Sequence, residues 1–239
     1  MRRAHNVVNG LSVANLKTCC APLTLHCPGR NIELCTQIFH ARRWIIRKTA
    51  AESASDTGEG MAEPLIVVDV QVGFLNSFTS HIPDRVVRLI ESGRFTPVLF
   101  TRFTNAPGSS YHRFLDWHDC VGAPETDLAP ELAPYAQPGS VFTKAGYTGL
   151  PDQLAAVLRE RGDEQVTIVG IDTDMCVLKV AMDIFDLGIR PVILIDCCAS
   201  TAGLQSHLAG LAVLARNIGA DQLRDAGLSG GWLGAPPAE

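Results

Sequence analysis

From Leu65 to Val70 the chain reads LIVVDV, a short and almost continuous apolar run. A strand that is buried on both faces has this composition, whereas a strand with one solvent-exposed face alternates apolar and polar residues. Near its end the run contains Asp69, whose carboxylate is costly to bury unless it is paired with another group or has a function. The pattern therefore predicts a central strand of a parallel sheet with a polar group near its carboxyl end.

Strand and helix patterns alternate along the chain after this run. Further strands are expected at residues 97–101, 141–143, 166–170 and 191–196. Helices are expected at residues 83–92, 151–161, 173–187 and about 203–217, and several begin at Pro or end at Gly. Such alternation indicates βαβ units, so we expect an α/β domain built as a three-layer, doubly wound and mostly parallel sheet.

Residues 1–60 differ from the rest in charge and in cysteine content. Residues 1–50 hold eight basic residues and one acid, whereas the remaining 189 hold 12 basic and 24 acidic residues. Three interpretations are open: an organellar targeting segment, a small metal-binding element built on Cys and His, or a dispensable extension. We favour the extension, because the cysteines lack the paired C-x₂-C spacing of zinc sites and Met61 stands before the first good strand. We therefore predict a poorly ordered extension at 1–60 and one folded domain at 61–239.

The bulk composition excludes several classes of protein. With 46% hydrophobic and 19% charged residues, the chain can bury a sizeable core. It has no run of about 18 apolar residues, so we expect no membrane span. Its net charge of −5 gives no general attraction to nucleic acid. Without a recognisable secretory signal, we expect a cytoplasmic protein with free thiols, or an organellar one if the basic segment is a targeting signal.

Polar residues follow three of the expected strands. Asp69 ends the first, Lys144 follows the strand at 141–143, and Cys176 lies in the turn after the strand at 166–170. Ligands of parallel α/β sheets bind beyond the carboxyl ends of the strands, so we expect these three side chains to converge there.

Cys176 lies where a helix is expected to begin, in the sequence GIDTDMCV from Gly170 to Val177. The dipole and the free N–H groups of a helix N-terminus favour a thiolate, the nucleophilic form of cysteine. Taken alone, the turn also fits a buried and inert thiol, because free cysteine is among the most buried residue types. The same interpretation, a core thiol, is the better one for Cys197 and Cys198 after the strand at 191–196, and Cys120 is left unassigned.

Three segments carry a resemblance to the isochorismatase-like cysteine hydrolases, which include nicotinamidases and N-carbamoylsarcosine amidase. They are VVDVQVGF from Val67, KAGY from Lys144 and GIDTDMCV from Gly170, and the similarity continues through DCCAS from Asp196. The resemblance spans about Glu63 to Leu223.

The resemblance implies a catalytic triad of Asp69, Lys144 and Cys176. It also implies a cis peptide at Ile171–Asp172 and an oxyanion hole made by the backbone N–H groups of Asp172 and Cys176. The implied reaction is hydrolysis of an amide, ureido or carbamoyl C–N bond of a small molecule through a thioester. Asp69 then serves as acid and base, Lys144 supplies charge, and no cofactor is needed.

The chain departs from two branches of this family. Nicotinamidases hold a metal with a D-x-H-type motif, and the stretch after Arg102 has none, so we predict no metal and disfavour nicotinamide as substrate. Isochorismatase proper lacks the nucleophilic cysteine, which disfavours isochorismate. Candidate substrate-binding residues are Gln71, Phe74, Arg102, Tyr111, Trp117 and Tyr147. For each of them packing is at least as good an explanation as substrate contact, and Trp117 is the one that we most expect to serve packing alone.

Two alternatives come from other classes. A catalytically silent binding or scaffold protein on the same fold is one, although an intact triad argues against it. A dinucleotide-binding or flavodoxin-like domain is the other, but the turn after the first strand has no G-x-G-x-x-G or P-loop. Relatives of this fold commonly form homodimers or homotetramers, so we expect a homo-oligomer with a small-molecule substrate.

Overall fold

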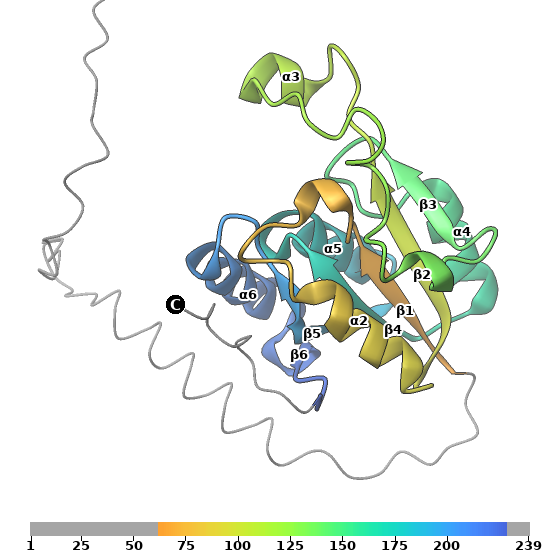
Figure 1. Ribbon diagram of the computed structural model, residues 1–239. Coiled ribbons are helices and arrows are strands. Elements are labelled where there is room, and N and C mark those ends of the chain that lie inside the picture. Colours follow the sequence, from red (N-terminus) through yellow and green to blue (C-terminus); the bar gives the residue numbers. More distant parts are fainter. Residues whose placement is uncertain (1–61, 229–239) are drawn as a thin grey trace, which may run out of the picture. The chain divides into compact units, whose positions relative to one another are not determined.

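The computed structural model describes residues 62–228, which form a six-stranded sheet flanked by helices (Figure 1). The predictions for residues 1–60 lie outside the described residues. The order of the strands is β3-β2-β1-β4-β5-β6, and each of the five pairings is parallel. The strands are β1 (Glu63–Val68), β2 (Phe95–Phe103), β3 (Val141–Lys144), β4 (Gln165–Ile171), β5 (Arg190–Ala199) and β6 (Leu223–Arg224). The predicted α/β class is confirmed, and the mostly parallel sheet proves to be parallel throughout.

The helices cover both faces of this sheet. Helix α2 packs on one face, whereas α4 and α5 lie on the other (Figure 1). The α-helices are α2 (Ile82–Glu91), α3 (Ser110–Leu115), α4 (Asp152–Arg161), α5 (Leu178–Asp186) and α6 (Leu204–Ile218). Short 3₁₀ turns are η2 (Val72–Phe74), η3 (Ala133–Tyr135) and η5 (Ala220–Gln222). Among the described residues, no helix has both the length and the apolar character needed to cross a membrane.

Two local differences from the sequence prediction concern the functional end of the molecule. The helix predicted at 173–187 begins as a π-helical turn, η4 (Thr173–Val177), and only then continues as α5. Helix α3 was not predicted, and Figure 1 shows it standing away from the sheet on a long connection. Its six residues are too few for a periodic apolar pattern to be visible in the sequence.

The centre of the core is β1, in which residues 65–68 are fully buried. Next to it, Gly170 of β4 adopts a φ of +127°, and a Cβ placed there would lie 2.2 Å from the carbonyl oxygen of Val68. Only glycine allows this close approach of the two strands. The chain therefore brings the end of β4, and the turn that follows it, directly beside the end of β1.

The direction in which the chain adds strands reverses between β1 and β4. From β1 the sheet grows through β2 to β3, and from β4 it grows the opposite way through β5 to β6. Loops on either side of such a switch point separate and leave a crevice at the carboxyl ends of the strands. This geometry makes the end of β1 and β4 the expected place for a ligand.

Candidate active site

Asp69 is the first residue after β1 and is completely buried. Its φ of +49° lies in the left-handed region, which an L-residue adopts only where its surroundings hold it. Thr101 of β2 supplies that support: its hydroxyl donates to Asp69 Oδ1 at 2.7 Å and accepts from the Asp69 N–H at 3.2 Å. The carboxylate is therefore fixed at the switch point, with Oδ2 facing away from Thr101.

Lys144 reaches this carboxylate from β3, across the intervening strand β2. Its ammonium Nζ lies 2.6 Å from Asp69 Oδ2, 3.1 Å from the Gly146 carbonyl oxygen and 5.4 Å from the centre of the Phe103 ring. Burial lowers the pKa of Lys144, but the charge of Asp69 and the neighbouring Cys176 outweigh burial and raise it overall. The two side chains therefore form a buried ion pair.

Cys176 completes the cluster from η4. Its Sγ lies 3.3 Å from Lys144 Nζ, and within the described residues Asp69 Oδ2 accepts no hydrogen bond beyond its ion pair. The structure thus brings Asp69, Lys144 and Cys176 together, from three separate segments, as the sequence predicted for their positions.

The charge state of Cys176 differs from the sequence expectation. We expected the helix N-terminus to favour the thiolate, but burial raises the pKa of the Cys176 thiol, and the negative charge of Asp69 raises it further. Lys144 opposes both effects without overcoming them. The raised pKa favours the protonated form of the thiol.

The π-helical turn that carries Cys176 is held from behind by α6. The Thr173 hydroxyl and His207 Nδ1 lie 2.7 Å apart, and burial lowers the pKa of His207 to about 4, so the imidazole is neutral. A Cβ on Gly210 would lie 2.7 Å from the backbone of Asp174, so α6 packs directly against the turn. Tight packing of this kind fixes the position of the Cys176 sulfur.

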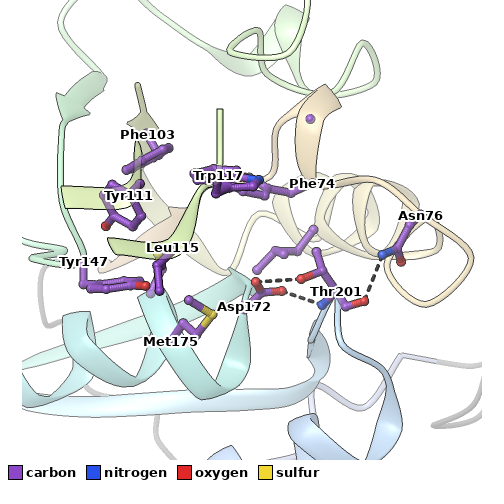
Figure 2. Close-up of a pocket in the computed structure, with 13 residues that line it drawn as sticks. Phe74, Asn76, Phe103, Tyr111, Leu115, Trp117, Tyr147, Asp172, Met175 and Thr201 are labelled. Atoms are coloured by element: carbon purple, nitrogen blue, oxygen red, sulfur yellow. Dashed lines mark hydrogen bonds between the residues drawn. The ribbon is translucent and has the colours of Figure 1, made fainter. Parts of the chain in front are cut away.

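Above Cys176 lies a cavity of about 350 Å³, drawn in Figure 2. It opens at the carboxyl ends of β1, β2, β4 and β5, and one side is built by the segment around α3. The residues that line it are Gly73, Phe74, Asn76, Phe103, Tyr111, Leu115, Trp117, Tyr147, Ile171, Asp172, Met175, Cys176 and Thr201. A space of this size is typical of a site for a small molecule, and Cys176 is among the residues that line it.

Four of the six predicted substrate-binding residues line this cavity: Phe74, Tyr111, Trp117 and Tyr147. Their rings form a continuous wall together with Phe103, in which each ring lies 5.1–6.3 Å from a neighbour. Trp117, which we expected to serve packing, contacts three of these rings and also lines the cavity.

The other two predicted residues lie elsewhere. Gln71 is fully buried, and its amide is used by the backbone: Oε1 accepts from the Phe103 N–H at 2.6 Å, and Nε2 donates to the carbonyl oxygens of Phe103 and Thr126. Arg102 donates to Thr143 Oγ1 at 3.1 Å on the partly exposed side of β2. Neither lines the cavity, so the structure assigns Gln71 to holding the loop after β1.

A polar chain lies along one wall of the cavity. The Asp172 carboxylate accepts from the Thr201 N–H at 2.5 Å and the Thr201 hydroxyl at 2.9 Å, and Asn76 Nδ2 donates to the Thr201 carbonyl oxygen (Figure 2). Burial raises the pKa of Asp172 to about 6, although the two bonds from Thr201 oppose the shift. The peptide bond between Ile171 and Asp172 is cis, as predicted.

Several of these residues were not named by the sequence analysis. Thr101, Thr201 and Asn76 are polar residues at the ends of strands or in the loops that follow them, so the rule that directed us to Asp69 and Lys144 applies to them too. Leu115 and Met175 carry no such signal, because an apolar residue at a cavity resembles one in the core.

The other three cysteines among residues 62–228 are free and buried. Cys197 and Cys198 lie within β5, and burial raises the pKa of both thiols, that of Cys198 to about 12. Their predicted burial in the core is confirmed. Cys120 is also buried, its pKa is raised to about 12 by burial, and it does not line the cavity.

The residues around α3 do not form a metal site. The rings of His112 and His118 have centroids 4.4 Å apart, but His118 Nε2 is paired with Asp116 Oδ1 at 2.9 Å and His112 Nδ1 accepts from the Gly108 N–H. Across residues 62–228, no three His, Cys, Asp or Glu side chains gather in a way that can hold a metal ion. The donors do not fit the D-x-H-type metal centre of nicotinamidases.

Comparison with known proteins places these features in a family. The isochorismatase domain family matches residues 63–224. The nicotinamidase/pyrazinamidase of Mycobacterium tuberculosis is 30% identical over 162 residues, covering 58% of this chain and 87% of that protein. The nicotinamidase/pyrazinamidase of Bacillus subtilis is similar in structure, with a TM-score of 0.58, 26% identity, and coverage of 69% of this chain and all of that one. N-carbamoylsarcosine amidase from Thermoplasma acidophilum shares the fold, with a TM-score of 0.58 and 21% identity over 72% of this chain and 100% of that one.

Proposed function

The chain belongs to the isochorismatase family, and on that premise we propose that it is a cysteine hydrolase that cleaves a C–N bond of a small amide, ureide or carbamoyl compound. The observation that carries the proposal is the buried contact of Asp69, Lys144 and Cys176 at the base of a cavity. A silent scaffold can use a buried ion pair for stability, but it does not need one placed against a thiol at the base of a cavity.

The reaction begins with transfer of the thiol proton to Asp69. The raised pKa of Cys176 means that free thiolate does not accumulate, so deprotonation accompanies attack on the substrate carbonyl. Apart from its ion pair with Lys144, Asp69 Oδ2 is not engaged by another side chain within the described residues, and we assign Asp69 as the base. Lys144, 3.3 Å from Sγ, stabilises the negative charge that develops on the sulfur.

Attack gives a tetrahedral intermediate with its negative charge on the former carbonyl oxygen. The backbone N–H groups of Asp172 and Cys176 are the proposed donors to this oxyanion. Asp69 then returns its proton to the leaving nitrogen, the C–N bond breaks, and a thioester remains on Cys176. A water molecule, deprotonated by Asp69, hydrolyses the thioester and restores the thiol. One amide and one water give one acid and one amine or ammonia.

Lys144 has a second task as a positioning charge. Its ammonium holds Asp69 Oδ2, while Thr101 holds Oδ1. Because the ammonium contacts both the acid and the sulfur, the charge it faces stays near −1 as the proton moves between them. A preorganised cation of this kind needs no rearrangement during the reaction.

The relatives support a C–N bond as the target. The proteins from M. tuberculosis and B. subtilis are named for the amides nicotinamide and pyrazinamide, and the protein from T. acidophilum for a carbamoyl compound. This chain lacks the clustered metal donors of nicotinamidases among its described residues, which keeps nicotinamide disfavoured as its substrate.

The proposal is tested by ammonia release from a panel of small amides and ureides, nicotinamide included, combined with intact-protein mass spectrometry. We expect turnover of at least one compound and, after rapid acid quench, a mass increase equal to the acyl group located on Cys176. The matched thiol control is Cys120→Ala, since Cys120 is buried nearby but does not line the cavity.

The Cys120→Ala variant is expected to form the adduct, and Cys176→Ala is not. An adduct on another cysteine, or turnover that survives Cys176→Ala, would overturn the assignment of the nucleophile. If no member of the panel reacts and no acyl adduct forms on Cys176, the scaffold alternative replaces the hydrolase.

A further inference from the structure

We propose that the cavity selects amide substrates that carry a positively charged ammonium group. Asp172 and the surrounding aromatic rings recognise this charge. The inference rests on the proposed function and names the substrate class of the same site. It comes from the charges of the cavity wall, the aromatic rings that line it and the environment of Asp172.

The charge of the cavity wall is negative. Among the 13 lining residues, all of them in the described part of the chain, none is Lys, Arg or His, and Asp172 is the one carboxylic acid. Asp69 and Lys144 lie behind Cys176 and neutralise each other. A substrate bearing a carboxylate therefore meets an uncompensated negative charge and no cation, whereas a substrate bearing an ammonium meets an attractive one.

The aromatic rings add to this preference. Phe74, Phe103, Tyr111, Trp117 and Tyr147 all line the cavity, and Figure 2 shows the labelled rings gathered on the side of the cavity away from Thr201. An aromatic face is negative, so several rings around one volume attract a cation, most strongly a large and weakly hydrated alkylammonium. A neutral apolar group gains the same burial without that attraction.

Asp172 has the capacity to bind such a group. Two of its acceptor positions take hydrogen bonds from Thr201, and a carboxylate offers about four. Within residues 62–228 no basic side chain forms an ion pair with it, although its side chain is mostly buried. A buried carboxylate without a counter-ion is costly, and a cationic substrate supplies the missing partner.

Matched pairs of amides test this inference. Acetamide, propanamide and butanamide are each prepared with a terminal trimethylammonium group, with the isosteric neutral tert-butyl group and with a terminal carboxylate. At neutral pH we expect kcat/KM for the best cationic member to exceed that for its neutral twin by about 10-fold, and the carboxylate member to be the poorest. A neutral twin that reacts as fast as or faster than every cationic member overturns the inference.

The Asp172→Asn variant tests the role of the carboxylate. The readout is the ratio of kcat/KM between cationic and neutral twins, which we expect to fall toward one. A purely structural role for Asp172 changes both twins equally and leaves the ratio intact, an outcome that contradicts the inference. The Thr201→Val variant keeps the carboxylate but removes one of its hydrogen bonds, and we expect the ratio to persist in it.

A binding measurement separates this inference from the proposed function. Isothermal titration of the Cys176→Ala protein with the trimethylammonium and tert-butyl amides requires no chemistry. If the cationic amides bind about 10-fold more tightly and the wild type hydrolyses nothing, the hydrolase proposal fails while the charge preference stands. If neutral and cationic amides bind alike and both are hydrolysed, the charge preference fails and the hydrolase stands.

Discussion

Two buried ion pairs, Asp69–Lys144 and Asp196–Arg85, lie at the sheet of this protein. They are built from similar groups but have different roles. Their closest nitrogen–oxygen distances are 2.6 Å and 3.3 Å, and no side chain in either pair is more than 9% exposed. A charge buried in this way is costly unless it is compensated, so each pair needs an explanation beyond its own Coulomb attraction.

The third partner distinguishes the two pairs. Asp196 of β5 uses its second oxygen to accept the Ala226 N–H at 2.7 Å, and its cation comes from α2. That arrangement fastens the last described segment and α2 to the sheet. Asp69 instead shares its cation, which lies 2.6 Å from its Oδ2, with a thiol at the base of a cavity. A carboxylate that pairs with a cation and a backbone N–H stabilises the fold, whereas one held beside a thiol at a cavity can take a proton.

The largest expected effect comes from removing the sulfur of Cys176, the third partner of the Asp69–Lys144 pair. Cys176→Ala should lower kcat/KM by at least about ten-thousand-fold, because it removes the nucleophile. The loss is measured on any amide found to react, and the fold is checked by thermal unfolding. Residual turnover above one-hundredth of wild type would show that the sulfur is not the nucleophile.

Asp69→Asn should lower kcat/KM by about a thousand-fold, since it removes the base but keeps the shape of the side chain. At the same time the thiol should ionise more easily, because Asp69 raises the pKa of Cys176 and the amide does not. The pH dependence of iodoacetamide modification should therefore shift to lower pH in the variant. A shift to higher pH contradicts the assigned role of Asp69.

Asp196→Asn is the matched substitution in the other pair. It removes the charge that faces Arg85, so we expect a loss of about 3 kcal/mol in the free energy of unfolding. Measured by urea denaturation, that loss corresponds to a change of roughly a hundred-fold in the folding equilibrium. The kcat of the folded fraction should change by less than about three-fold, and a catalytic loss as large as that of Asp69→Asn would abolish the distinction between the pairs.

The smallest expected effect concerns Asp172, whose carboxylate belongs to the cavity wall. Burial raises the pKa of Asp172 to about 6, with smaller contributions from Asp174 and Asp69, while the Thr201 bonds act in the opposite direction. The carboxylate is thus charged above that pH and neutral below it. The preference for a trimethylammonium amide over its tert-butyl twin should therefore fall by up to about 10-fold as the pH decreases through 6. Taking the ratio cancels titrations, such as that of Cys176, which affect both substrates alike.

Much of the fold and the position of the triad could be predicted from local sequence. The LIVVDV run and the alternation of strands with helices predicted the parallel sheet, and the ends of those strands pointed to Asp69, Lys144 and Cys176. The family resemblance added the cis peptide before Asp172. Each of these signals is contained in a window of a few residues, where apolar period, Pro and Gly determine local structure.

The cavity wall could not be predicted in the same way. Gln71 and Trp117 both looked like loop residues near the site, yet one holds the backbone of β2 and the other lines the cavity. Helix α3 gave no periodic signal, although its segment supplies Tyr111 and Leu115 to the wall.

The sequence alone established the fold class and the chemical groups at one edge of the sheet, because both follow from the residues within each strand and turn. The state of those groups depended on contacts between segments far apart in the chain. The neutral thiol of Cys176 follows from its burial next to Asp69, and the raised pKa of Asp172 follows from burial, which the hydrogen bonds from Thr201 oppose. Desolvation depends on everything packed around a group, and that packing exists only in the folded protein.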